Sequence, residues 1–156
     1  MHRALQLVFG ALLSLLLCGP GQAQDVRTRS LAGVYDDVKF ELTNAVIAKG
    51  LAIETEGNVA RMLDRTAADV GATRTIYRNA GYIAFCSARY SRMIMEADPA
   101  GVGFCPFTIF LYETSEKPGE IVAGYRRFGA ARSPALARAF AEVEALLDAI
   151  LADALK

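Results

Sequence analysis

Histidine and tryptophan are the residues that this sequence most conspicuously lacks: it contains one histidine, His2, and no tryptophan. Cysteine is scarce as well, because the chain holds three residues of this type, Cys18, Cys86 and Cys105. An imidazole is required for Ser-His and Cys-His nucleophile pairs, for histidine zinc sites and for histidine-ligated haem. These classes of site therefore depend entirely on whether the mature protein keeps residue 2.

The first residues have the pattern of a secretory signal peptide. The basic Arg3 precedes an apolar run from Leu7 to Leu17, and a small-residue site follows at Gly21-Gln22-Ala23. The run is too short to span a bilayer, which takes about 20 residues. We expect residues 1–23 to be cleaved, a mature N-terminus near Gln24, and a periplasmic or secreted location.

Cleavage would remove His2, so histidine-dependent sites are excluded from the expected mature chain. Cys18 leaves a lipoprotein as the alternative, in which this cysteine becomes the acylated first residue. The preceding Leu17 is larger than the small residue that such processing normally takes. Because cleavage would also remove the apolar run, we expect no membrane span in the mature chain.

The rest of the sequence fits one compact domain. The 17 basic and 17 acidic residues balance, which argues against nucleic acid as a partner, because binding to phosphates needs a basic excess on one face. Residues 24–30 are mostly polar, and residues 24–34 are predicted to be a flexible leader. Residues 35–156 are of single-domain size and are predicted to form one α+β domain, a two-layer sandwich of an antiparallel sheet with helices mainly on one face.

The predicted elements rest on caps, apolar stripes and turn residues. We expect helices from the cap Asp36 to Gly50, from Asn58 to Gly71, from the cap Ser87 to Asp98-Pro99, and from the cap Ser133 nearly to Lys156; the last is long and amphipathic. We expect strands over Leu51–Glu54, Tyr82–Cys86, Phe104–Glu113 and Ile121–Phe128, the last two joined by a turn at 117–120.

The strand expected over Phe104–Glu113 is apolar on both faces. Cys105, Phe107, Ile109 and Leu111 alternate with Phe104, Thr108, Phe110 and Tyr112. A sheet with one wet face alternates apolar with polar side chains, so this pattern indicates that the second face is covered too. A protein partner, a ligand, a second subunit and the chain's own loops are the alternatives, and a homodimer is the partner that we expect.

The segment from Tyr82 to Arg127 resembles the bacterial domain of unknown function 302 family. The resemblance rests on the strand ending in Phe85-Cys86-Ser87-Ala88, a short helix over Ser91–Pro99, the run Gly103-Phe104-Cys105-Pro106-Phe107-Thr108-Ile109, and a strand containing tyrosine. The resemblance implies helices packed on an antiparallel sheet, a frequently dimeric protein, and no established activity or cofactor. With its export signal, the chain looks like an exported branch of that family.

Cys86 and Cys105 pose the sharpest chemical question. They stand at the end of one expected strand and the start of the next, and antiparallel neighbours would bring both to the same edge of the sheet. A structural disulfide, two buried thiols, a redox-active pair, and a Cu(I) site completed by Met93 or Met95 are the alternatives. The absence of Cys-x-x-Cys spacing argues against the redox pair.

A group of arginines and tyrosines is a second candidate site. Arg89, Arg92, Arg126 and Arg127 occur close to Tyr90 and Tyr125, and guanidinium groups can hold an anion through paired hydrogen bonds. Pairing with carboxylates such as Glu96 or Asp98 is the alternative. The possible ligand contacts are Arg89, Tyr90, Arg92, Tyr112, Tyr125 and Arg126.

No catalytic constellation emerges, and we predict no cofactor. The favoured interpretation is an exported binding or accessory module of unknown ligand, dimeric and more consistent with a non-enzyme than with an enzyme. The alternative is a thiol-disulfide or soft-metal redox protein that uses Cys86 and Cys105.

Overall fold

The domain is built on one antiparallel sheet of five strands in the order β1-β5-β4-β3-β2. The structure is a computed structural model and describes residues 26–156. The expected signal peptide, its cleavage site and Cys18 lie outside these residues. In the described part of the chain, no helix has the length and apolar character needed to cross a bilayer.

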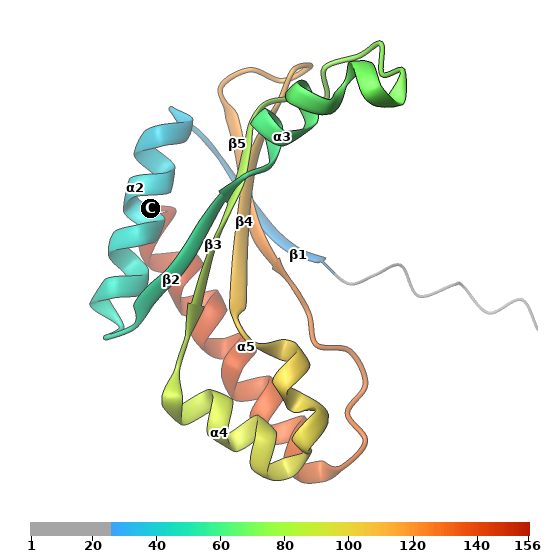
Figure 1. Cartoon of the computed structure of the whole chain (residues 1–156). Coiled ribbons are helices and arrows are strands. Elements are labelled where there is room, and N and C mark those ends of the chain that lie inside the picture. The colour runs from blue at the N-terminus through green and yellow to red at the C-terminus, as the bar shows by residue number, and fades with distance from the viewer. Residues whose placement is uncertain (1–25) are drawn as a thin grey trace, which may run out of the picture.

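The helices lie along one side of the sheet and at its two ends (Figure 1). In chain order the elements are β1 (Val26–Ala32), α2 (Tyr35–Ala48), β2 (Ala52–Asn58), α3 (Val59–Thr66), the 3-10 turn η2 (Ala68–Val70), β3 (Tyr77–Cys86), α4 (Ala88–Ala97), the 3-10 turn η3 (Pro99–Phe104), β4 (Phe107–Thr114), β5 (Glu120–Arg126) and α5 (Pro134–Ala154). This arrangement is the predicted α+β sandwich with a long C-terminal helix.

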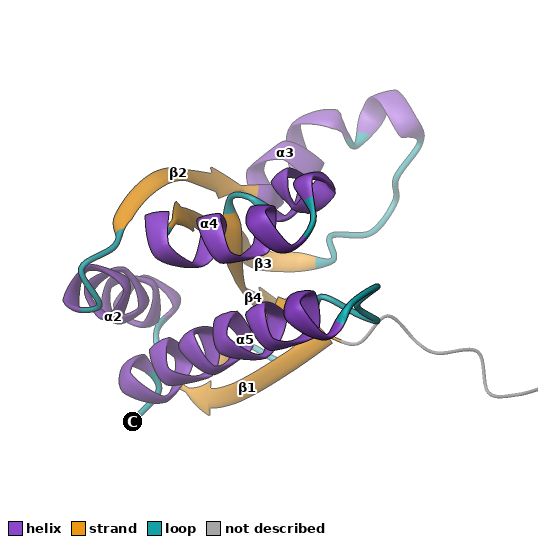
Figure 2. Ribbon diagram, turned by 90° about the horizontal axis from the view of Figure 1, so that it is seen from below, coloured by secondary structure: helices purple, strands orange, loops and turns teal. Residues whose placement is uncertain are grey.

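The core lies between α5, α2, α4 and the inner face of the sheet. Figure 2 shows α4 and α5 side by side, and α2 also packs against α5. The predicted stripe of α5 is buried at Phe140, Val143, Leu147 and Ile150. The sheet contributes the alternate, fully buried residues of its central strands: Ile83, Phe85, Phe107, Ile109, Leu111, Ile121, Ala123 and Tyr125.

Residues 26–32 form an edge strand, so the prediction of a flexible leader over 24–34 was wrong for this part. β1 pairs with β5 along its whole length, from Val26 opposite Arg126 to Ala32 opposite Glu120. Leu31 packs against the core, and Arg27 forms an ion pair with Asp148 of α5 at 3.0 Å. The polar composition that indicated a leader reflects a strand whose side chains are mostly exposed.

The strand expected from Phe104 begins three residues later, at Phe107. Asp98 accepts a hydrogen bond from the backbone N–H of Ala100 at 2.9 Å and caps η3, which extends through Phe104. Phe104 therefore lies off the sheet, against Phe128 and Phe140. Cys105 lies in the connection to β4 and not on a strand face.

Several helix boundaries follow their predicted signals, and two do not. Ser87 and Ser133 cap α4 and α5 through bonds to Tyr90 N and Leu136 N. Asp36 is not the cap of α2: the cap position is Val34, and Asp36 sits in the first turn, where a carboxylate favours the positive end of the helix dipole. α3 ends at Thr66, well before Gly71, because a separate 3-10 turn follows it.

The outer face of the sheet carries aromatic rings that lie over glycines of neighbouring strands. Tyr82 lies opposite Gly57, and Phe110 lies opposite Gly124. A Cβ atom at Gly57 would collide with the Tyr82 ring, and one at Gly124 would come within 3.0 Å of Phe110 Cζ. Glycine at these positions therefore lets the rings approach the neighbouring strand closely.

We expect Gly124→Ala to destabilise the domain by about 1–3 kcal/mol, because the new methyl group would collide with the backbone oxygen of Arg27 and crowd Phe110. Thermal unfolding followed by circular dichroism measures the change. Gly103→Ala is the matched control, since a Cβ atom there meets nothing within 4 Å. Equal melting temperatures for Gly124→Ala and the wild type would contradict this prediction, because they would show that the strands shift to accommodate the methyl group.

Candidate functional site

The two cysteines lie together where β3 ends and β4 begins. β3 and β4 are antiparallel neighbours, with Phe85 opposite Phe107, so the end of one strand meets the start of the other as predicted. Both cysteines are half-buried free thiols, and the side chain of Cys86 forms a hydrogen bond with Cys105. The structure thus contains two interacting thiols and not the disulfide that was among the alternatives.

The thiol pair extends onto the neighbouring helix. Cys105 Sγ lies 3.1 Å from Ser91 Oγ of α4, within hydrogen-bonding distance. The negative charge of Glu54, on β2, contributes to a raised pKa of Cys86. Glu54 is the unpaired residue where the register between β2 and β3 shifts, between Ile53 and Thr55. The site is therefore assembled from β2, β3, α4 and the segment before β4.

The electrostatics of this site favour the protonated thiol of Cys86. Burial, followed by the influence of Cys105 and of the Glu54 carboxylate, raises the pKa of Cys86 above its ordinary value. Reactive thiols in redox enzymes have the opposite property, a lowered pKa that supplies the nucleophilic thiolate. Within residues 26–156, no three His, Cys, Asp or Glu side chains are grouped to hold a metal ion.

The second candidate site is the outer face of the central strands. Phe110 and Tyr112 stack at a centroid distance of 6.2 Å, and Tyr77 tilts against Tyr112 at 5.5 Å. Tyr82 is the partner of Phe110 across β3 and β4. We call these four residues, Tyr77, Tyr82, Phe110 and Tyr112, the aromatic platform.

The aromatic platform is uncharged at its centre. By strand alternation, the outer-facing residues around it are Ala80 and Ala84 of β3, Thr108 of β4, and Val122 and Gly124 of β5. The four rings are half-buried, because they shield one another and the sheet. The sequence pattern identified Phe110 and Tyr112 as an apolar outer face. Tyr77 was missed because β3 was expected to begin at Tyr82, whereas it begins at Tyr77. Tyr82 was placed in a strand but not assigned to this face.

Gly57 also lies on this face and was not predicted to do so, although the sequence contains a signal for it. An isolated glycine within a strand marks a close approach by another group, here the ring of Tyr82. The predicted strand ended at Glu54, so Gly57 fell outside it, whereas β2 continues to Asn58.

The arginines and tyrosines proposed as anion contacts are not gathered into one site. On α4, Arg89 pairs with Glu142 of α5 at 3.3 Å and lies over the Tyr90 ring, while Arg92 pairs with Glu96 at 3.2 Å. Carboxylate pairing, the alternative considered for these arginines, is therefore what the structure contains.

The remaining members of that group lie on opposite faces of the sheet. Tyr125 is buried on the inner face, and its hydroxyl donates a hydrogen bond to Asp148 at 3.1 Å. Burial and this contact raise the pKa of Tyr125, so it stays a protonated donor. Arg126 and Tyr112 project from the outer face, since alternate residues of a strand point to opposite sides.

The fold and these sites define a small two-layer α+β domain with a thiol pair at one end of its sheet and an uncharged aromatic face. Residues 26–154 match the family described as Domain of unknown function DUF302, and the chain belongs to that family. No curated protein matches the sequence.

A solved structure has the same fold. It is the crystal structure of an uncharacterized conserved protein DUF302 from Bacillus stearothermophilus, with a TM-score of 0.70 and 16% sequence identity. The alignment covers 85% of this chain and 99% of that one. At this identity the likeness establishes the arrangement of helices and strands.

We expect alkylation of Cys86 by iodoacetamide to rise with pH through a midpoint above that of an ordinary thiol, because its pKa is raised and the thiolate is the reactive form. Cys105→Ser should move the midpoint to lower pH, since Cys105 contributes to the shift. Peptide mass spectrometry follows Cys86 separately. An unchanged midpoint in Cys105→Ser would contradict the contact between the two thiols.

Proposed function

We propose that this chain is an exported binding or accessory domain that acts through the aromatic platform, and that the platform's partner is a second copy of the chain. The N-terminal pattern of a basic start, an apolar run and a small-residue site supports export. The observation that carries the binding role is the uncharged aromatic centre of the outer sheet face.

The chemistry of this face suits self-association. Aromatic residues are enriched in the cores of protein interfaces, where they bury large areas, and charged residues are depleted there. In a two-fold dimer a surface patch meets its own copy, so a charge at its centre would face a like charge. The platform avoids this conflict, because charged outer-facing residues such as Glu120 and Arg126 occur at the ends of β5 and not at its middle.

A dimer formed in this way should dissociate on Phe110→Asp, because burying an unpaired carboxylate in an apolar contact costs several kcal/mol. Sedimentation at micromolar concentration should give a dimer for the wild type and a monomer for the variant. Circular dichroism should show that the variant stays folded, because the helix-covered face is unchanged.

Phe40→Asp is the matched control for this experiment. Phe40 is also aromatic and is 63% exposed on α2, away from the platform, so its replacement should leave the dimer intact. A monomeric wild type would reject a second copy as the partner. Dissociation of both variants would place the interface elsewhere.

A second candidate function is supported by the contact between Cys86 and Cys105. In an oxidising compartment these two thiols are placed to lose two protons and two electrons to an oxidant and form a disulfide. The same pair can supply the soft sulfur ligands that Cu(I) prefers. Either role would make the chain a thiol or copper protein rather than a purely binding one.

Exposure of the reduced chain beginning at Gln24 to oxidised glutathione should convert both thiols into one intramolecular disulfide, because the partner thiol is closer than a second glutathione. Titration of free thiols and intact mass measure the product. Glutathione adducts on both cysteines would contradict this expectation. Protection of both thiols by added Cu(I), lost in Cys105→Ser, would favour the copper role instead.

A further inference from the structure

An open hollow of about 460 Å³ lies at the end of the sheet opposite α4, where β2 leads into α3. Arg61 and Arg65 of α3 lie one turn apart, at positions i and i+4, and therefore share one face of the helix. The hollow is lined by Asn58, Ala60, Arg61, Asp64, Arg65, Arg78 and Asn79. We call it the arginine hollow.

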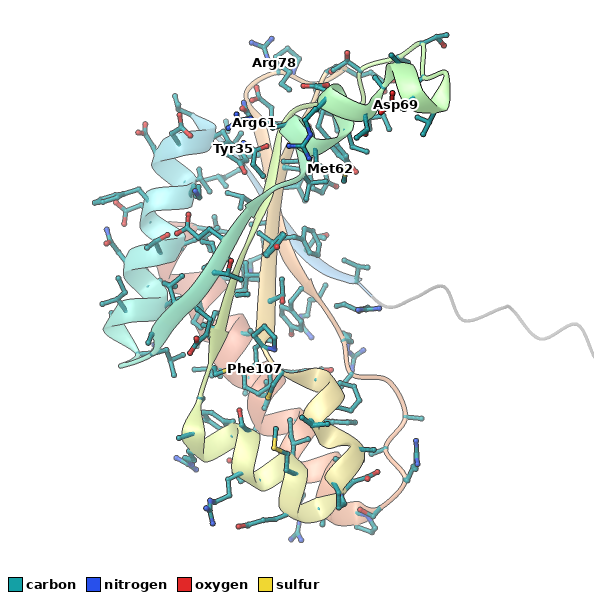
Figure 3. All side chains as sticks on the ribbon, viewed as in Figure 1. Tyr35, Arg61, Met62, Asp69, Arg78 and Phe107 are labelled. Carbon is teal, nitrogen blue, oxygen red and sulfur yellow. The ribbon has the colours of Figure 1, made fainter. Side chains whose placement is uncertain are left out.

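The third arginine reaches the hollow from β3 because of a bulge. Tyr77 pairs with Thr114 and Asn79 pairs with Glu113, so Arg78 is the extra residue between them. A bulge of this kind redirects the side chain of the extra residue away from the strict alternation of a strand. Figure 3 shows Arg78 and Arg61 at the same end of the molecule, far from Phe107 at the other end.

The positive charge of the arginine hollow is poorly compensated by the protein. Among the described residues, Arg61 and Arg65 have no carboxylate partner, and Asp64 is the one acidic residue in the lining. Arg78 lies 3.6 Å from Glu113, but that carboxylate already accepts hydrogen bonds from Asn79 and from the backbone N–H of Gly119.

Several of the other surface arginines, though not all of them, are paired with carboxylates. Arg89, Arg92 and Arg127 each pair with a glutamate at 3.3, 3.2 and 3.0 Å respectively. Like charges at i and i+4 destabilise a helix, so the spacing of Arg61 and Arg65 opposes the folding of α3 in the absence of an anion. A bound anion would remove that repulsion.

We propose that the arginine hollow binds a phosphate group. Guanidinium groups present paired N–H donors that match the oxygens of phosphate. With Asp64 in the lining and Glu113 beside Arg78, the site keeps a net positive charge, and three guanidinium groups can donate to more oxygens than the two of a carboxylate. A free phosphorylated molecule and the headgroup of an anionic lipid both carry a phosphate group. The lining of the hollow contains none of the four residues of the aromatic platform, although Arg78 directly follows Tyr77 in β3.

Titration of the protein with inorganic phosphate, followed by the backbone amide signals in NMR spectra, tests the proposal. Saturating shifts are expected at residues 58–65 and 77–79, with sodium chloride added to the reference sample to keep the ionic strength equal. Arg61→Gln and Arg78→Gln should each weaken binding about tenfold, since each removes a charged hydrogen-bond donor. Acetate should bind more weakly than phosphate.

Arg138→Gln is the matched control, because Arg138 is exposed on α5 and its loss changes the net charge of the protein equally. This variant should bind phosphate like the wild type. Shifts that fail to saturate, that sodium chloride reproduces, or that Arg138→Gln weakens as much as Arg61→Gln would overturn the proposal. Amide spectra of each free variant establish that α3 is still folded.

Sedimentation with vesicles distinguishes the two sources of the phosphate group. Vesicles of phosphatidylcholine with phosphatidylglycerol are compared with vesicles of phosphatidylcholine alone. Binding to the former that Arg61→Gln abolishes would identify a lipid headgroup as the source. Saturable phosphate binding without vesicle binding would identify a free phosphorylated molecule. Vesicle binding that Arg61→Gln leaves intact, without saturable phosphate binding, would overturn the proposal.

Discussion

The packing of α5 against the inner face of the sheet is the contact on which the rest of the domain depends. α2 and α4 both pack on α5, so this helix holds the other two in place as well as covering the strands. Polar contacts fix its position: Asp148 accepts a hydrogen bond from Tyr125 of β5 and pairs with Arg27 of β1. Because α5 takes up the inner face, the aromatic rings of Phe110 and Tyr112 are left on the other side, where a partner can meet them.

Local signals predicted much of this fold. Ser87 and Ser133 cap α4 and α5, because their side chains accept hydrogen bonds from the first helical turn. Gly50, with a φ of 73°, lies just beyond the end of α2. These features depend on a few adjacent residues. β1 was missed because its stability comes from β5, far along the chain, and its own composition is polar. The start of β4 was misplaced because the 3-10 turn η3 uses apolar residues that also suit a strand.

The candidate sites also differ in how far the sequence predicted them, because some depend on neighbouring segments and others on contacts between distant ones. The meeting of Cys86 and Cys105 follows from pairing two consecutive strands, which sequence order indicates. The proposed anion contacts on α4 failed to form a site because Arg89 meets Glu142 of α5, a contact between helices that no local pattern indicates. The arginine hollow was missed because it requires the bulge that turns Arg78 toward α3, and the predicted strand began after that residue.

The pairing of β1 with β5 also sets the order in which the sheet can be completed. Val26 lies opposite Arg126, so nearly the whole domain separates the first strand from its neighbour along the chain. A chain synthesised, or passed through a membrane, N-terminus first would hold β1 without a partner until β5 emerged. The side chains of Val26–Ala32 are mostly exposed, and the four at its centre are polar or charged. Such a strand can wait for its partner, because an unpaired strand of low hydrophobicity has little tendency to aggregate.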